Sequence, residues 1–266
     1  MTKHNLSIHT SIIALGLILL GFVPLSADGV IWTEAPQFEL LVNGKTDLTA
    51  RIYQPQQYKP LMLIVSREFK SPILLDLKAR TYGEVKMAPV SSSEDISITL
   101  PDIIKAANPK PYTVTKGVTA FTLAGKSVKI KYKESLVGEV SLGILLAHSP
   151  VYKLLRDKYK PNPNDIKKLK QLKKKTDVVC LFATWCPTCK LTVPRFLKIM
   201  QLVNKGTYNI RYIGIAMGGS EPAHFLEKYG HDYPAFIFFR NGKEIGRITG
   251  NPVRSLEREM YEILKK

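Results

Sequence analysis

The spacing of hydrophobic and polar residues divides the chain into two parts. From about residue 30 to residue 132 the apolar runs are short, and several alternate with polar residues, as strands do. The run 61–65 is wholly apolar, whereas 118–123 and 128–132 alternate on either side of a turn at 124–127. Further strands are expected at 47–54, 73–77 and 96–100. The pattern predicts a β-rich domain, built as a sandwich or a partial barrel.

After residue 132 helical patterns and strand patterns alternate. Short helices are expected at 142–147 and 150–159, and a helical pattern resumes near residue 165. The elements expected after it are strand 177–183, helix 191–203, strand 209–217, helix 221–229, strands 235–240 and 244–249, and helix 252–265. A helix between two strands makes a parallel pair, and the Asn241-Gly242 turn makes an antiparallel one. We expect an α/β domain with a mixed four-stranded sheet flanked by helices.

These patterns and the first residues together predict the domain organisation. Residues 1–27 combine Lys3, an apolar run at 12–23 and a small-residue end at Ala27, which is the layout of a secretory signal peptide. A β-rich domain of unknown role, ending in short helices, is expected at 28–160, with a proline-containing linker at 161–164 and the α/β domain at 165–266. The leader predicts an extracytoplasmic, periplasmic location. The alternative is a signal that stays uncleaved and anchors the protein in a membrane through residues 12–25.

The charge of the chain limits the partners that it favours. A formal net charge of +17 attracts acidic proteins, anionic lipid surfaces and other polyanions. No zinc-finger spacing, aromatic RNA-binding motif or basic zipper is present, so no nucleic-acid partner is expected. The lysines at 167–175 surround one apolar helical face and are typical of a solvated surface, with a docking patch for an acidic partner or an anionic membrane as the alternative.

All three cysteines lie close together, at positions 180, 186 and 189. An exported chain with no other cysteine has no disulfide framework, so these thiols favour chemistry over structure. Cys186 and Cys189 form a Cys-x-x-Cys turn between an apolar strand and a helix. The free N–H groups at the helix N-terminus stabilise a thiolate, which makes Cys186 a candidate nucleophile. Cys189 lies one turn later on the same side, where it can form a disulfide with Cys186.

Other uses of these thiols are less well supported by the spacing. A structural zinc site needs two further ligands, and no second cysteine pair exists. A Cu(I) site would combine the same two cysteines with a distant histidine, for which His231 is the candidate. Cys180 reads as a small buried hydrophobic residue, with a third redox thiol as the alternative.

The second domain resembles the thioredoxin superfamily over residues 165–266. The residues that carry the resemblance are Trp185 to Lys190 at the active-site turn, Pro194 in the following helix, Tyr233-Pro234, the hairpin Phe239 to Lys243, and Gly250. The Pro187-Thr188 dipeptide is also similar to that of exported thioredoxins that supply reductant for cytochrome c assembly.

The resemblance implies a thiol–disulfide oxidoreductase whose catalytic residues are Cys186 and Cys189. It implies that Pro234 follows a cis peptide bond and faces the dithiol. The residues implied to bind substrate are Trp185, Tyr233 and Pro234, and those implied to support the site are Pro187, Thr188, Lys190 and Cys180. The partners implied are a protein disulfide and a membrane or soluble electron donor. No metal and no organic cofactor is expected, since the redox group is the Cys186–Cys189 disulfide itself.

Two features leave the function open. Cys180 stands where cytosolic thioredoxins carry a buried aspartate that moves the proton of the second thiol, so the direction of the reaction is not fixed. In the alternative, the β-rich domain binds a partner or the protein handles copper, and the α/β domain acts as a carrier or a redox-sensitive scaffold.

Overall fold

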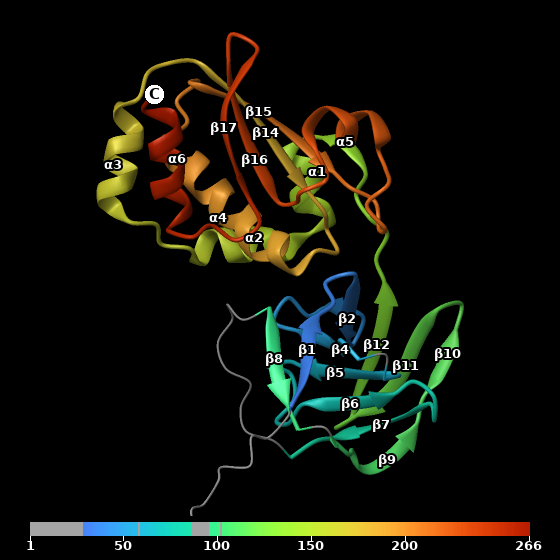
Figure 1. Ribbon diagram of the computed structural model, residues 1–266. Coiled ribbons are helices and arrows are strands. Elements are labelled where there is room, and N and C mark those ends of the chain that lie inside the picture. The colour runs from blue at the N-terminus through green and yellow to red at the C-terminus, as the bar shows by residue number, and fades with distance from the viewer. Residues whose placement is uncertain (1–28, 58, 87–95, 102) are drawn as a thin grey trace, which may run out of the picture.

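The computed structural model describes residues 29–57, 59–86, 96–101 and 103–266, which form two bodies joined by one connection (Figure 1). The body made by the earlier residues contains two antiparallel sheets, and the other contains one mixed sheet flanked by helices. The expected signal peptide lies outside the described residues. Within the described ranges, no helix combines the length and the apolar character needed to cross a bilayer.

The β-rich domain is a sandwich of two sheets. The strands of the seven-stranded sheet, in spatial order, are β8 (Ser97–Leu100), β1 (Val30–Glu34), β4 (Arg51–Pro55), β5 (Leu61–Val65), β6 (Ile73–Asp76), β7 (Thr81–Glu84) and β9 (Ala107–Pro111). Those of the five-stranded sheet are β10 (Thr113–Thr115), β11 (Val118–Leu123), β12 (Lys126–Tyr132), β2 (Phe38–Val42) and β3 (Lys45–Thr46). All neighbouring strands in both sheets are antiparallel.

Alternation along the strands explains how the two sheets meet. In β12, Val128 and Ile130 are buried while Lys129 stays exposed, so one face of the strand enters the core. The same core holds Ile64 and Ile73 from the opposite sheet. Burial of these apolar faces against each other is what holds the sandwich together, and it confirms the β-rich prediction.

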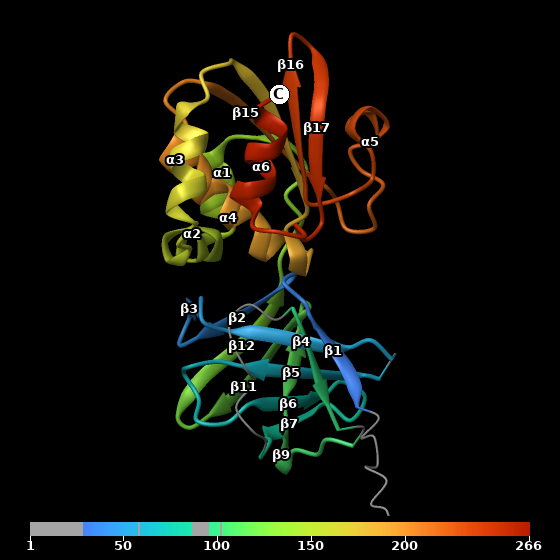
Figure 2. The same ribbon diagram turned by 60° about the vertical axis from the view of Figure 1, so that its left-hand side comes forward.

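The second body is a mixed sheet with helices on its faces (Figure 2). Its strands, in spatial order, are β13 (Gly138–Val140), β15 (Tyr208–Gly214), β14 (Thr176–Phe182), β16 (Ala235–Arg240) and β17 (Lys243–Thr249). Its helices are α1 (Leu142–His148), α2 (Pro150–Lys158), α3 (Pro163–Gln171), α4 (Pro187–Val203), α5 (Ala223–Tyr229) and α6 (Leu256–Leu264). Only the β14–β15 pair is parallel, as the helical link between them requires.

The sheet has five strands, so the expectation of four was wrong. The added strand, β13, pairs antiparallel with β15 at the edge of the sheet. It is three residues long and begins with Gly138, and such a segment is too short to show an alternating pattern in the sequence.

The boundary between the domains also differs from the expected linker at 161–164. Helices α1 and α2 bury Leu145 and Tyr152 in the core of the α/β domain, where α2 packs against α4. Both helices therefore belong to the α/β domain, because their apolar faces are covered by it. The connection between the two bodies is the segment between Tyr132, at the end of β12, and Gly138, at the start of β13.

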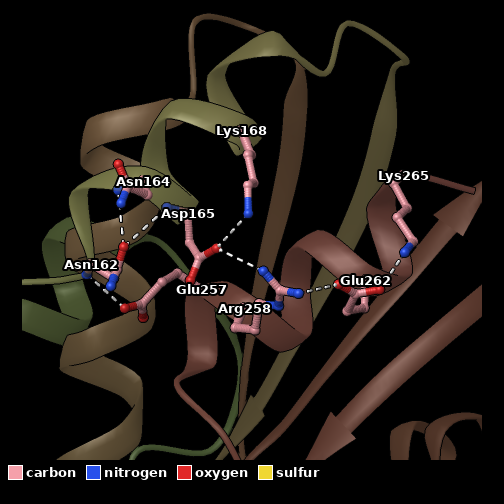
Figure 3. A network of polar contacts seen from close by, with 8 residues as sticks. All are labelled: Asn162, Asn164, Asp165, Lys168, Glu257, Arg258, Glu262 and Lys265. Carbon is pink, nitrogen blue, oxygen red and sulfur yellow. Dashed lines mark hydrogen bonds and ion pairs between the residues drawn. The ribbon is translucent and has the colours of Figure 1, made fainter.

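The segment that was expected to be a linker is fixed against α6 (Figure 3). The side chain of Asn162 caps α3 by accepting hydrogen bonds from the backbone N–H groups of Asn164 and Asp165. The backbone N–H of Asn162 donates to the buried Glu257 carboxylate at 2.8 Å, and Arg258 pairs with Asp165 at 3.3 Å. These contacts make residues 161–164 an ordered part of the α/β domain.

Candidate active site

The Cys-x-x-Cys turn lies between the end of β14 and the start of α4. Cys186 is the N-cap residue of α4, with extended backbone angles, and Pro187 occupies the first helical position. Proline suits that position because its ring presets φ and no N–H is needed there. The Cys189 backbone N–H donates to Cys186 Sγ at 3.1 Å. The sequence thus places the first sulfur where a helix N-terminus offers its free donors.

The two thiols of the turn have opposite electrostatic environments. The pKa of Cys186 is lowered, first by the hydrogen bond with the Cys189 side chain and then by the backbone N–H groups of Cys189 and Thr188, which outweigh burial. The pKa of Cys189 is raised well above its ordinary value, chiefly because burial disfavours the charged form. Cys186 is 7% exposed and Cys189 is 0% exposed. The charged form is therefore stabilised at Cys186, which is slightly exposed, and disfavoured at Cys189, which is enclosed.

A third thiol and a phenol are buried near this pair. Cys180 lies in the middle of β14, and its pKa is raised by burial. Tyr152, from α2, is buried in the same core, and its pKa is raised by burial and by the charges of the three cysteines. Its hydroxyl has no hydrogen-bond partner among the residues that the structure describes. No sequence signal marked Tyr152, because α2 was assigned to the other domain.

Aromatic side chains border the cysteine turn. Trp185 donates from Nε1 to the carbonyl of Ile215 at 3.1 Å, and its ring meets that of Tyr233 edge to face with the centroids 5.4 Å apart. The peptide bond between Tyr233 and Pro234 is cis, as expected. The pKa of Tyr233 is raised, first by burial and then by the charges of Cys186 and Cys189. The structure therefore brings Trp185 and Tyr233 together beside the dithiol.

Comparison with known proteins decides the family. A family model described as Thioredoxin matches residues 162–262. Thioredoxin-1 of Schizosaccharomyces pombe is 30% identical over 79 residues, which are 29% of this chain and 71% of that protein. The chain belongs to the thioredoxin family.

Two mitochondrial thioredoxins are also similar to this chain. The mitochondrial Thioredoxin-2 of S. pombe is 30% identical over 83 residues, 31% of this chain, and the chain spans only 58% of that protein's length. The solved structure of oxidised mitochondrial thioredoxin 3 from Saccharomyces cerevisiae is 23% identical, with 38% of this chain and 86% of that chain covered and a TM-score of 0.26. Family membership therefore rests on the sequence matches.

Lys190, which the resemblance implies to support the site, makes its ion pair with the other domain. It follows Cys189 in the thioredoxin domain, and its side chain is only 12% exposed. It pairs with the carboxylate of Glu34, from β1 of the sandwich, which also pairs with Arg51 at 3.2 Å. Lys190 and Glu34 are 156 positions apart, so no local sequence pattern could predict their contact.

No metal ligand set forms around the thiols of the thioredoxin domain. Over the described ranges, no three His, Cys, Asp or Glu side chains are close enough to hold a metal ion. The copper alternative required Cys186, Cys189 and His231 to meet, and they do not form such a group.

Proposed function

We propose that the protein is an exported thiol–disulfide oxidoreductase that reduces disulfides of extracytoplasmic proteins. The observation that carries this proposal is the asymmetry of the dithiol. Cys186 Sγ accepts the Cys189 N–H at the start of α4, while the Cys189 thiol is fully enclosed. An accessible thiolate is the attacking group in disulfide exchange, and an enclosed thiol beside it is protected from alternative partners.

The reaction proceeds in two exchange steps. The Cys186 thiolate attacks one sulfur of the substrate disulfide, forms a mixed disulfide and releases the other substrate sulfur as a thiolate. Cys189 then gives up its proton to the substrate thiolate released in the first step and attacks Cys186 Sγ, which breaks the mixed disulfide and forms Cys186–Cys189. The substrate gains two electrons and takes up protons on its two sulfurs, and the enzyme is oxidised by the same two electrons. A membrane or soluble dithiol donor restores the reduced enzyme by the reverse exchange.

The groups around the dithiol supply the binding face. Trp185 and Tyr233 are held edge to face, and the Trp185 indole is fixed by its bond to the Ile215 carbonyl. The cis residue Pro234 directly follows Tyr233, and its carbonyl accepts from the Gly250 N–H at 2.8 Å, which fixes this loop. We assign substrate contact to Trp185, Tyr233 and Pro234.

The export and the direction of the reaction rest on the sequence. The apolar run at 12–23, with small residues after it, supports export to the periplasm. The Pro187-Thr188 dipeptide supports the reducing direction and a role in cytochrome c assembly. A small difference between the reduction potentials of enzyme and substrate decides that direction.

Insulin reduction in the presence of dithiothreitol tests the activity. Wild-type protein should accelerate the precipitation of insulin chains, and the Cys186→Ser variant should match the rate of dithiothreitol alone. Cys180→Ala serves as the matched control and should keep the activity, because the fully buried Cys180 thiol cannot reach a substrate disulfide. Equal rates for wild type and Cys186→Ser would exclude this function.

A further inference from the structure

Three charged side chains meet where the two domains touch, one of them buried and two of them largely covered. The Glu34 side chain is 2% exposed, and it pairs with Lys190 at 12% and with Arg51 at 14% exposure. Glu34 and Arg51 belong to the sandwich, whereas Lys190 belongs to α4, which lies on the side of the thioredoxin domain that faces the sandwich (Figure 1). A buried carboxylate between two cations fixes the position of both, because separating either one leaves a charge without compensation.

Lys190 is attached one helical turn after the reactive cysteine. Its backbone N–H donates to the Cys186 carbonyl at 3.0 Å. Residues four positions apart lie on one face of a helix, with their Cβ atoms about 5–6 Å apart. The flexible four-carbon side chain of a lysine spans that distance easily, and an ammonium beside a thiolate stabilises it. The ion pair with Glu34 directs this ammonium toward the sandwich instead.

Other charged groups share the junction but do not replace Glu34. A cavity of about 60 Å³ between the domains is lined by Glu34 and Lys190 and also by Glu39, Asp47 and Lys133. Glu39 pairs with Lys131 and accepts from Thr46, and Asp47 accepts from Ser66 and Thr49. The pKa of Lys133 is lowered, first by burial and also by the nearby charge of Lys190, against the opposing effect of Glu39. Among these acids, Glu34 is the one in contact with the Lys190 ammonium.

We propose that the β-sandwich tunes the redox site through Glu34. By holding the Lys190 ammonium, Glu34 withholds a positive charge from the Cys186 thiolate. A less stabilised thiolate makes the reduced form less favourable, so the dithiol is a stronger reductant than the thioredoxin domain would be without this contact. Glu34 is thus a positioning residue that acts on the thiol through Lys190. This inference rests on the proposed exchange reaction and gives the β-rich domain a part in it.

Four variants test the proposal in the full chain: Glu34→Gln, Lys190→Met, the double variant and Glu39→Gln as the matched control. The readouts are the pH dependence of Cys186 alkylation by iodoacetamide and the equilibrium of the dithiol with reduced and oxidised glutathione. Glu34→Gln should move the alkylation midpoint to lower pH and shift the glutathione equilibrium toward the reduced enzyme by roughly three- to tenfold. Lys190→Met, the double variant and Glu39→Gln should match wild type.

The result that overturns the proposal is a Glu34→Gln midpoint equal to wild type, or a shift that persists in the double variant. If Glu34→Gln does not fold, Glu34→Asp replaces it. The shorter side chain keeps the charge but loosens the contact, and a folded Glu34→Asp with no shift in either readout contradicts the proposal. Failure of the proposed function is distinguishable, because it appears as absent insulin reduction in wild type, whereas failure here appears as an unmoved midpoint in an active enzyme.

Discussion

The N-cap position of Cys186 predicts a difference in stability between two inactive variants. Its sulfur accepts the Cys189 N–H at 3.1 Å, so the reactive atom also caps α4. The serine oxygen in Cys186→Ser can accept the same hydrogen bond, whereas Cys186→Ala removes the acceptor. Neither variant can form the Cys186–Cys189 disulfide, so the comparison isolates the cap.

The size of the difference follows from the burial of the cap. Replacing a capping side chain with alanine costs about 0.5–2 kcal/mol. Cys189 is 0% exposed, so no water can accept a hydrogen bond from its N–H when the sulfur is lost. An unsatisfied buried donor costs about 1–3 kcal/mol. We expect Cys186→Ala to be less stable than Cys186→Ser by about 1–2 kcal/mol, or roughly 2–8 °C in melting temperature.

Urea denaturation of the reduced proteins, followed by far-ultraviolet circular dichroism, measures this difference. Two other helix starts provide controls. Ser255 is the N-cap of α6 but makes no side-chain capping bond, so Ser255→Ala should cost less than about 0.5 kcal/mol. Asn162 caps α3 with its side chain, so Asn162→Ala should cost about 1 kcal/mol. Equal stabilities of Cys186→Ser and Cys186→Ala would refute the capping role and weaken the explanation of the thiolate.

Three further predictions concern the core and the pH response. Tyr152→Phe removes a buried hydroxyl that lacks a partner among the described residues, so it should raise the free energy of unfolding by about 1 kcal/mol in urea titration. A decrease of that size would contradict the absence of a hydrogen-bond partner for this hydroxyl. Phe236→Ala should lower the free energy of unfolding by about 3–5 kcal/mol, because the Phe236 ring is buried and stacks on Phe196 with the centroids 4.5 Å apart. A decrease under about 1 kcal/mol would show that neighbouring side chains fill the space left by the ring. Because folding lowers the Cys186 pKa from an ordinary value of 9.0, the stability that it contributes is fully present above pH 9 and is lost as the pH falls through the lowered pKa. Folding raises the Cys189 pKa, so the stability that Cys189 contributes is present below pH 9 and is lost only as the pH rises further. Reduced wild type should therefore lose more stability than Cys186→Ser as the pH is lowered from 9 in chemical denaturation, and parallel curves would contradict the lowered Cys186 pKa.

The sequence predicted an element correctly wherever its hydrophobic pattern agreed with a start or turn signal beside it. Strand β14, helix α4 and the hairpin of β16 and β17 each combine an apolar run with a recognisable start or turn, and all lie close to the expected positions. The position of Cys186 at the N-terminus of α4 was predicted in the same way, since a strand that ends in Cys-x-x-Cys places the first cysteine at the start of the next helix.

The features that the sequence did not reveal depend on contacts between distant residues. Helix α2 has an amphipathic pattern that does not specify which core covers it, so Tyr152 was placed in the wrong domain. The long side chain of Lys190 can reach several surroundings, and its partner, Glu34, belongs to the other domain. The association of the two sheets into a sandwich likewise depends on pairings that no short window contains.

A mixed-disulfide trap tests the central claim most directly. Reduced Cys189→Ser protein is mixed with a peptide disulfide, quenched with acid and digested, and the modified cysteine is identified by mass spectrometry. The account predicts a stable adduct on Cys186 alone, no adduct on the buried Cys180, and a wild-type protein that resolves the adduct to Cys186–Cys189. An adduct on Cys180, or a Cys186 adduct that persists equally in wild type, would contradict the assignment of Cys186 as nucleophile and Cys189 as resolving thiol.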